Sequence, residues 1–418
     1  MLAFLKKYNI NDALLLLILI TLPLAEHWNS KILLLTTLIV IIRLYKEFKI
    51  SFPKISWLYL LFFLFACISY FWSGDKLETF ESIIKLLPFL LFSIGYKQFF
   101  SFKDIDKTVR ISAIIFLLYG LILTLLAYFR YQETQDTETF FYHKLTAPLE
   151  ANAIYIALLF GLVYIFLLYT ILFKESKSKI LDISLTILLF GFQLLLSSKM
   201  ILSILILISL LFFIKYLKTS GFSKKKLSLG IILVISAVAL IGTSPFTKNR
   251  FKEILNYKQI EDVFEKEYFG PAHYWNGLTL RLFQLRCFYE IEQKTEFNRS
   301  LGTGFGASQP FLNQKYTEYD LYRGPTGKGE SDGYFVYNLH NQYTQILIEL
   351  GIFGGILILL MLYFFVLYPL TNKNILLLGV GLLFISFALT ESYLFRQKGV
   401  VSFILFPLLA TYQQNKQD

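Results

Sequence analysis

Cysteine and histidine are scarce in this chain of 418 residues, which contains two cysteines and four histidines. Cys67 lies in an apolar stretch and Cys287 in the longest polar segment, so the two thiols are not expected to form a disulfide. No group of Cys, His, Asp and Glu residues recurs at the spacing of metal ligands. The sequence therefore predicts neither a disulfide scaffold nor a metal site, and we expect the protein to act without a metal or a cofactor.

Charge is also sparse. Charged residues make up 17% of the chain, against about 25% in typical soluble domains. Hydrophobic residues make up 56% and the mean hydropathy is +0.57, which excludes an ordinary soluble protein and indicates a membrane protein. The formal net charge is +11, but no nucleic-acid-binding motif is present. We attribute the excess to membrane topology and to attraction to anionic membrane lipids, not to a nucleic-acid partner.

Apolar stretches of helical length recur from one end of the chain to the other, and each can cross a bilayer core of about 30 Å. Because Lys6 and Lys7 precede it, the first apolar stretch resembles a signal peptide. The many apolar stretches that follow favour a transmembrane helix that stays in the mature protein. The sequence thus predicts an all-α integral membrane protein with about 12 transmembrane helices and one large, mainly helical periplasmic loop. The predicted spans lie near 11–27, 31–45, 55–73, 82–100, 111–129, 151–173, 180–197, 200–217, 228–243, 342–369, 375–393 and 399–413.

The segments between these spans alternate between rich and poor in Lys and Arg. Under the positive-inside rule, this alternation places both termini in the cytoplasm and the longest segment outside. We therefore divide the chain into three parts. Residues 1–242 hold spans one to nine, 243–339 form a periplasmic loop domain, and 340–418 hold the last three spans and a short cytoplasmic tail. No internal repeat is evident, so an inverted-repeat transporter gains no support.

The stretch HNQYTQILIELGIFGG, residues 340–355, sets polar side chains directly against an apolar run. On a helix, Asn341, Gln345 and Glu349 recur every four residues and form one polar stripe. A carboxylate inside a membrane span is costly unless it is paired, so Glu349 is a functional candidate. His340, at the aqueous end of the stripe, is either a helix-end cap or a general base, a role that imidazole fills well near neutral pH.

Glycines mark two further places. Gly351 and Gly355 form a G-x-x-x-G pair, which predicts a close contact with a neighbouring helix. The stretch LGTGFG, residues 301–306, lacks the preceding strand, the following helix and the Lys-Ser/Thr of a phosphate-binding loop, so we interpret it as a turn.

Three basic residues are candidate ligands for an anionic substrate. Arg281 and Arg286 lie on one predicted helix and either are solvated charges or clamp a phosphate, whose oxygens match guanidinium bidentately. Lys199 is the sole charge in a tight turn between two apolar runs. There it either extends to the membrane interface or offers a cation to an anionic substrate.

Together these segments resemble the O-antigen ligase family of polytopic glycosyltransferases. The resemblance covers the layout of spans and outer loop, and it is sharpest in LRLFQLRCFYEIEQ, LGTGFG and HNQYTQILIELGIFGG. The matching positions are Arg281 in the loop, His340 with Asn341, Glu349 with Gly351 and Gly354, and Asn152 at the start of the sixth span. One position departs from the family pattern: Lys199 stands where an arginine is usual, which keeps the charge but loses bidentate geometry.

The resemblance implies a function. Such enzymes transfer a glycan from undecaprenyl pyrophosphate to an acceptor hydroxyl, which for a ligase belongs to lipid A–core, at the periplasmic face of the bacterial inner membrane. By this resemblance His340 would be the catalytic base, the pyrophosphate would bind Arg281, Lys199 and Arg286, and Asn341, Glu349 and Asn152 would have supporting roles. The reaction would be metal-independent, because cationic side chains can stabilise a pyrophosphate leaving group.

Two other functions remain open. One is a polymerase of O-antigen or exopolysaccharide repeat units, which would use the same chemistry. The other, less favoured, is a lipid-linked glycan transporter that is not an enzyme, because the ionisable groups near the membrane lie at its outer rim and not in a central cavity.

Overall fold

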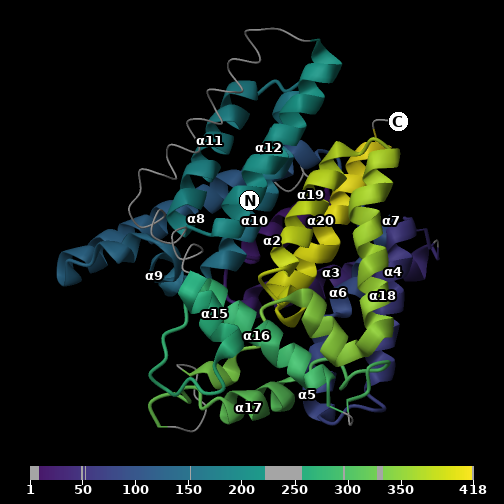
Figure 1. Ribbon diagram of the computed structural model, residues 1–418. Coiled ribbons are helices and arrows are strands. Elements are labelled where there is room, and N and C mark those ends of the chain that lie inside the picture. Colours follow the sequence, from purple (N-terminus) through teal and green to yellow (C-terminus); the bar gives the residue numbers. More distant parts are fainter. Residues whose placement is uncertain are drawn as a thin grey trace.

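The computed structural model describes residues 9–48, 50–51, 53–150, 152–221, 257–294, 297–326 and 333–416. Within these ranges every regular element is a helix and no strand is present, which confirms the all-α prediction (Figure 1). The longer helices are α2 (Ile10–Thr21), α3 (Glu26–Lys46), α4 (Lys54–Ser69), α8 (Ile105–Thr134), α10 (Ala153–Phe173), α11 (Lys179–Leu196), α12 (Lys199–Ser220), α16 (Gly277–Glu292), α18 (Gln342–Thr371), α19 (Ile375–Ala388) and α20 (Gln397–Asn415). The shorter ones are α5 (Lys76–Lys85), α6 (Leu87–Ile94), α7 (Tyr96–Phe99), α9 (Tyr142–Thr146), α15 (Tyr257–Glu265) and α17 (Gln309–Glu318), with 3₁₀ turns η1 (Thr137–Phe140), η2 (Ala147–Leu149), η4 (Tyr334–Val336) and η5 (Tyr393–Phe395).

Six of the described helices are long and apolar enough to cross a membrane: α3, α8, α10, α11, α12 and α18. Helices α2, α4 and α19 are apolar but shorter. The described part of the chain therefore supports six spans by length and does not confirm the predicted twelve. The predicted span near 228–243 lies outside the described residues.

The predicted span near 82–100 is not one helix, because the stretch is divided among α5, α6 and α7. Pro88 lies in the first turn of α6, where its missing N–H leaves no hydrogen bond unmade. Helix α6 ends at Gly95, where a Cβ would lie 2.5 Å from Cγ1 of Val40 on α3. The hydropathy of this stretch predicted one continuous span and could not reveal these interruptions.

Helix α10 lies inside the bundle and packs against α8, α11, α12 and α19. Nearly all of its side chains are buried. Its sequence, AIYIALLFGLVYIFLLYTILF, is apolar on every face, which is typical of a helix enclosed by other helices.

Helices α15–α17 lie at one end of the bundle, and the C-terminal end of α20 lies at the other (Figure 1). Near the N-terminus, the side-chain amide of Asn9 donates to the Ser101 carbonyl at 2.7 Å. Near the C-terminus, Nζ of Lys416 donates to the carbonyl of the next residue, Phe102, also at 2.7 Å. Residues 101–102 thus bond both the first described residue, Asn9, and the last, Lys416.

The described part of the predicted loop domain has a hydrophobic core of its own, which extends onto α18. Asn276 begins α16 with a capping box: its side chain accepts from the Thr279 N–H, and the Thr279 hydroxyl accepts from the Asn276 N–H. The buried core residues are Val263, Trp275, Phe283, Cys287, Ile291, Leu312, Tyr316, Tyr319, Leu321, Leu339 and Ile348. Since Ile348 belongs to α18, this domain is packed directly on the membrane helices.

Helix α18 is interrupted at Gly351, whose φ of 61° and ψ of −160° are not helical. The break removes the helical bond between the Ile352 N–H and the Ile348 carbonyl. Both groups find new partners in the LGTGFG region: Ile352 donates to the Arg299 carbonyl, and Ile348 accepts from the Thr303 N–H, each at 2.9 Å. Backbone polar groups near a membrane must be paired in this way. Residues 301–306 do form turns, as predicted, whereas Gly351 contacts a loop and does not form the predicted helix–helix seam.

Gly351→Ala is expected to destabilise the protein. A side chain in this glycine-only conformation costs about 1–3 kcal/mol, and the new Cβ would overlap the Ser300 carbonyl. The melting temperature of the purified protein in detergent measures the effect. The matched control is Gly191→Ala in α11, where a Cβ meets nothing within 4 Å, so this change should be neutral or slightly stabilising. Equal melting temperatures for both variants would contradict the strained conformation at Gly351.

Candidate active site

His340 lies in a tight turn at the start of α18. Its backbone N–H donates to Asn338 Oδ1 at 2.9 Å, and its φ is 43°, in the left-handed region. Asn341 then caps α18, since its Oδ1 accepts from the N–H groups of Tyr343 and Thr344 at 3.0 and 3.2 Å. Asparagine suits positions 338 and 341, because its short side chain can accept a hydrogen bond from a backbone N–H two or three residues later in the chain. The turn and the helix cap formed by NLHN, residues 338–341, thus orient the His340 side chain.

Arg281 extends from α16 to the connection that follows α19. Its Nε donates to the Thr390 carbonyl at 2.9 Å, its Nη1 to the Gly277 carbonyl at 2.6 Å and its Nη2 to Glu391 Oε1 at 2.7 Å. The guanidinium is therefore fixed by three partners. Its side chain is still 22% exposed, so it remains accessible to a ligand.

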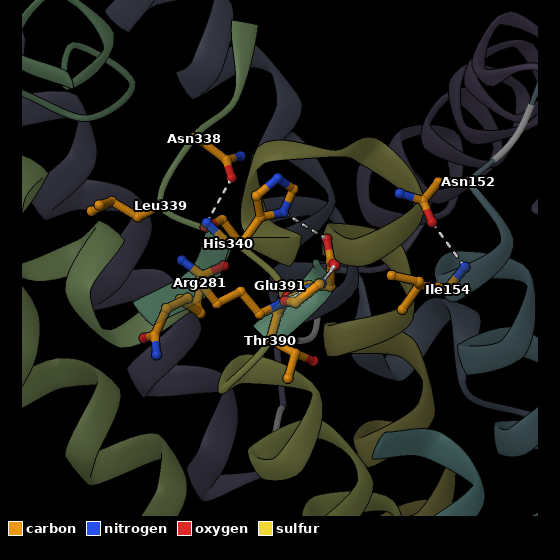
Figure 2. Close-up of polar contacts among 12 residues, drawn as sticks. Asn152, Ile154, Arg281, Asn338, Leu339, His340, Thr390 and Glu391 are labelled. Atoms are coloured by element: carbon orange, nitrogen blue, oxygen red, sulfur yellow. Dashed lines mark hydrogen bonds and ion pairs between the residues drawn. The ribbon is translucent and has the colours of Figure 1, made fainter. Parts of the chain in front are cut away.

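The Glu391 carboxylate joins Arg281 to His340 (Figure 2). While Oε1 accepts from Arg281, Oε2 lies 3.4 Å from Nδ1 of His340. Burial alone would raise the pKa of the Glu391 carboxyl, which is 3% exposed, but the neighbouring His340 and Arg281 hold this pKa below its usual value. Glu391 is therefore ionised at neutral pH.

The two nitrogens of His340 have different surroundings. Nδ1 faces Glu391, whereas Figure 2 shows Nε2 on the side of the ring that points away from the carboxylate. An ionised carboxylate accepts hydrogen bonds and cannot donate them, so it favours the tautomer with the proton on Nδ1. In that tautomer Nε2 has a free lone pair, which is what a general base requires.

Gln345 connects the segments on either side of this pair. Its Oε1 accepts from the Leu339 N–H at 3.1 Å and from the Ser392 hydroxyl at 3.4 Å. Leu339 precedes His340 and Ser392 follows Glu391. The buried side chain of Gln345 therefore fixes the backbone next to His340 relative to the backbone next to Glu391.

Glu349 was predicted to lie on a polar stripe that leads to His340, but its carboxylate is enclosed by other side chains. It is fully buried, and its Oε1 accepts from Gln345 Nε2 at 2.5 Å and from the Ser308 hydroxyl at 2.9 Å. No hydrogen bond joins Glu349 or Asn341 to the imidazole, so any support they give is indirect, through the helix start and the Gln345 network. Asn152 is likewise a cap, with its Oδ1 accepting from the Ile154 N–H at 2.8 Å, and Figure 2 shows it apart from the Glu391–His340 contact.

Arg286 is not brought together with Arg281, because five residues on a helix separate their faces. Its Nη1 donates to the carbonyls of Val263 and Lys266 at 2.8 and 2.7 Å, and its Nε donates to Glu290 at 2.9 Å. These bonds hold the end of α15 against α16, so the expected clamp of two arginines is not formed. Lys199 is the first residue of α12, in the turn where it was predicted, and is partly buried.

Glu391 is the site residue that motif reasoning does not identify. Its segment, LTESYLF, carries no recognisable pattern. The one available signal was an acidic residue at the end of an apolar span, the same signal that made Glu349 a candidate.

A comparison with known protein families matches the part of the chain that contains most of these residues. The sequence profile of a family described as O-antigen ligase matches residues 109–359, well over half of the chain. The matched range includes Asn152, Lys199, Arg281 and His340 and ends before Glu391. No curated protein matches the sequence.

We expect Arg281 and Glu391 to be energetically coupled. Arg281→Met would leave a buried carboxylate without its guanidinium and should lower the free energy of unfolding by about 3 kcal/mol. The double variant Arg281→Met/Glu391→Leu should be more stable than Arg281→Met, because no unpaired charge then remains buried. A double-mutant cycle in detergent measures the coupling. The exposed pair Lys144–Asp136 serves as control and should show none; purely additive effects at Arg281 and Glu391 would reject the coupling.

Proposed function

Because the chain belongs to the O-antigen ligase family, we propose that it is a membrane glycosyltransferase that moves a glycan from undecaprenyl pyrophosphate to a hydroxyl of lipid A–core. The active site faces the periplasm from the bacterial inner membrane, on the side that carries α15–α17. The observation that supports this proposal most directly is the Arg281–Glu391–His340 cluster. It combines a base and a guanidinium in one partly exposed place, which group transfer from a pyrophosphate requires.

His340 acts as the general base in this proposal. Its Nδ1–H donates to Glu391, and its Nε2 takes the proton of the acceptor hydroxyl as the hydroxyl oxygen attacks the anomeric carbon of the donor sugar. The new C–O bond forms as the bond from that carbon to the phosphate oxygen breaks. The electron pair leaves with undecaprenyl pyrophosphate. Glu391 stabilises the imidazolium formed, and it neither gains nor loses a proton.

Arg281 stabilises the departing pyrophosphate. A guanidinium has five N–H donors, and the contacts with Thr390, Gly277 and Glu391 use three of them. One N–H on each of Nη1 and Nη2 therefore remains for phosphate oxygens. Because Glu391 offsets the positive charge of Arg281, a second cation is needed for the leaving group, and we assign this role to Lys199.

A deletion strain tests the overall function. Loss of lipid A-linked polysaccharide, with undecaprenyl-linked polymer retained, is the result expected for a ligase. Lipid A–core that carries single repeat units would instead indicate the repeat-unit polymerase. A wild-type polysaccharide profile in the deletion strain would overturn both assignments.

His340→Ala is expected to lower the turnover of the purified enzyme by about 10²–10⁴-fold while donor binding changes little, since a general base acts in the transition state. The control is His27→Ala, exposed at the start of α3, which should be silent.

A second variant tests the role of Glu391. Glu391→Gln should lower kcat more than it raises KM. In the His340→Ala background, however, the same change should have little further effect on kcat, because Glu391 acts through the imidazole. A full additional loss in that background would show that Glu391 does not work through His340.

The reaction is proposed to need no metal ion, because Arg281 and Lys199 supply the positive charge that a metal would otherwise provide. In the described ranges no group of three or more His, Cys, Asp or Glu side chains is arranged to hold a metal. Exhaustive chelation should therefore leave the transfer rate of the purified enzyme unchanged. A loss of activity that magnesium or manganese restores would contradict this.

A further inference from the structure

A basic groove lies beside residues 101–102, apart from the Arg281–Glu391–His340 cluster. It has a volume of about 370 Å³ and opens between the last turn of α3 and helix α7. Its lining residues are Arg43, Lys46, Glu47, Lys97, Gln98 and Ser101. Three cations and one acid line the groove, so it carries an excess of positive charge.

Arg43 is held in a defined orientation within this groove. Its Nη1 donates to Asn11 Oδ1 at 2.6 Å and to the Gln98 carbonyl at 2.7 Å. Asn11 is itself 1% exposed and donates to the Ser101 hydroxyl at 2.6 Å. Among the described residues, Nε and Nη2 of Arg43 have no hydrogen-bond partner. One edge of the guanidinium is thus anchored, and the other is available for a bidentate contact with an oxyanion.

The other two cations are also available. Lys46 and Lys97 are exposed, and neither forms an ion pair with a described residue. Two other basic residues at the same end of the bundle as the groove are, by contrast, neutralised: Arg110 pairs with Asp182 at 2.6 Å, and Lys174 pairs with Asp106 at 2.9 Å. What distinguishes the groove is that three cations line one cavity and none of them forms an ion pair with a described residue.

The outer surface of α3 beside the groove is apolar. Ile41 and Ile42 are each 55% exposed, and Tyr45 is 93% exposed. Such a surface suits the acyl chains of a bilayer, and an aromatic ring at the helix end suits the interface. A molecule that presents a phosphate at the groove and hydrocarbon along α3 would satisfy both features together.

We propose that this groove binds the phosphate head group of an anionic phospholipid. The phosphate accepts from Nε and Nη2 of Arg43, Lys46 and Lys97 neutralise the remaining charge, and the acyl chains lie along α3. Basic pockets at the ends of transmembrane helices have the charge and position to hold such head groups. The proposal is independent of the glycosyltransferase assignment, because it rests on a separate part of the molecule.

Binding of phosphatidylglycerol and phosphatidylcholine to the purified full-length protein, measured by native mass spectrometry, tests the proposal. The wild type should prefer phosphatidylglycerol. Lys46→Gln/Lys97→Gln should weaken phosphatidylglycerol binding by roughly 25-fold, about fivefold for each charge removed, and leave phosphatidylcholine binding unchanged. Arg43→Gln should weaken it similarly; the double lysine variant keeps the test valid if Arg43→Gln unfolds, since neither lysine bonds another described residue.

The matched control is Lys103→Gln/Lys218→Gln, which removes two exposed charges at the same end of the bundle but outside the groove. Retained phosphatidylglycerol binding in this control, with loss in the groove variant, supports a specific site. Equal loss in both double variants would show attraction to overall charge only and would overturn the proposal. Competition by millimolar glycerol phosphate as effective as that by phosphatidylglycerol would identify a site for soluble anions and would overturn the assignment to a lipid.

Discussion

A carboxylate removed from water must have charged or hydrogen-bonding partners, and Glu391 obtains them from two distant parts of the chain. Arg281 precedes it by 110 residues and His340 by 51. To satisfy this single buried group, the loop domain, the start of α18 and the connection after α19 must come together. The contacts that stabilise the assembled fold are therefore the same contacts that orient the imidazole and the guanidinium of the proposed active site.

The break in α18 imposes a similar requirement on backbone groups. Once Gly351 leaves the helical conformation, the Ile348 carbonyl and the Ile352 N–H need partners, and the turn region 299–304 supplies them. The loop domain is consequently attached to the membrane helices at two places, through this region and through Arg281. Two attachments restrict how α16 can move relative to α18, and a catalytic site needs groups held at fixed positions.

Much of the local structure could be predicted from the sequence. The span near 151–173 corresponds to α10 and the span near 342–369 to α18, because a long apolar run is itself the physical cause of a buried or membrane helix. Asparagines at helix starts, such as Asn152 and Asn341, became caps for equally local reasons. The G-x-x-x-G prediction at Gly351 failed because glycine suits both a helix seam and a positive φ, and the residue type alone does not distinguish them.

The sequence by itself determined the all-α membrane class, the family and the choice of Arg281 and His340 as candidate site residues, because hydropathy and short motifs are properties of neighbouring residues. Only the tertiary structure decided that Glu391 pairs with the His340 imidazole, that Asn341 and Glu349 form no hydrogen bond with it, and that Arg286 holds α15 rather than joining Arg281. These outcomes depend on which helix faces pack together, and the helices concerned can be more than a hundred residues apart in the sequence. No local periodicity specifies that packing, because it follows from burying apolar surface and pairing polar groups over the whole molecule.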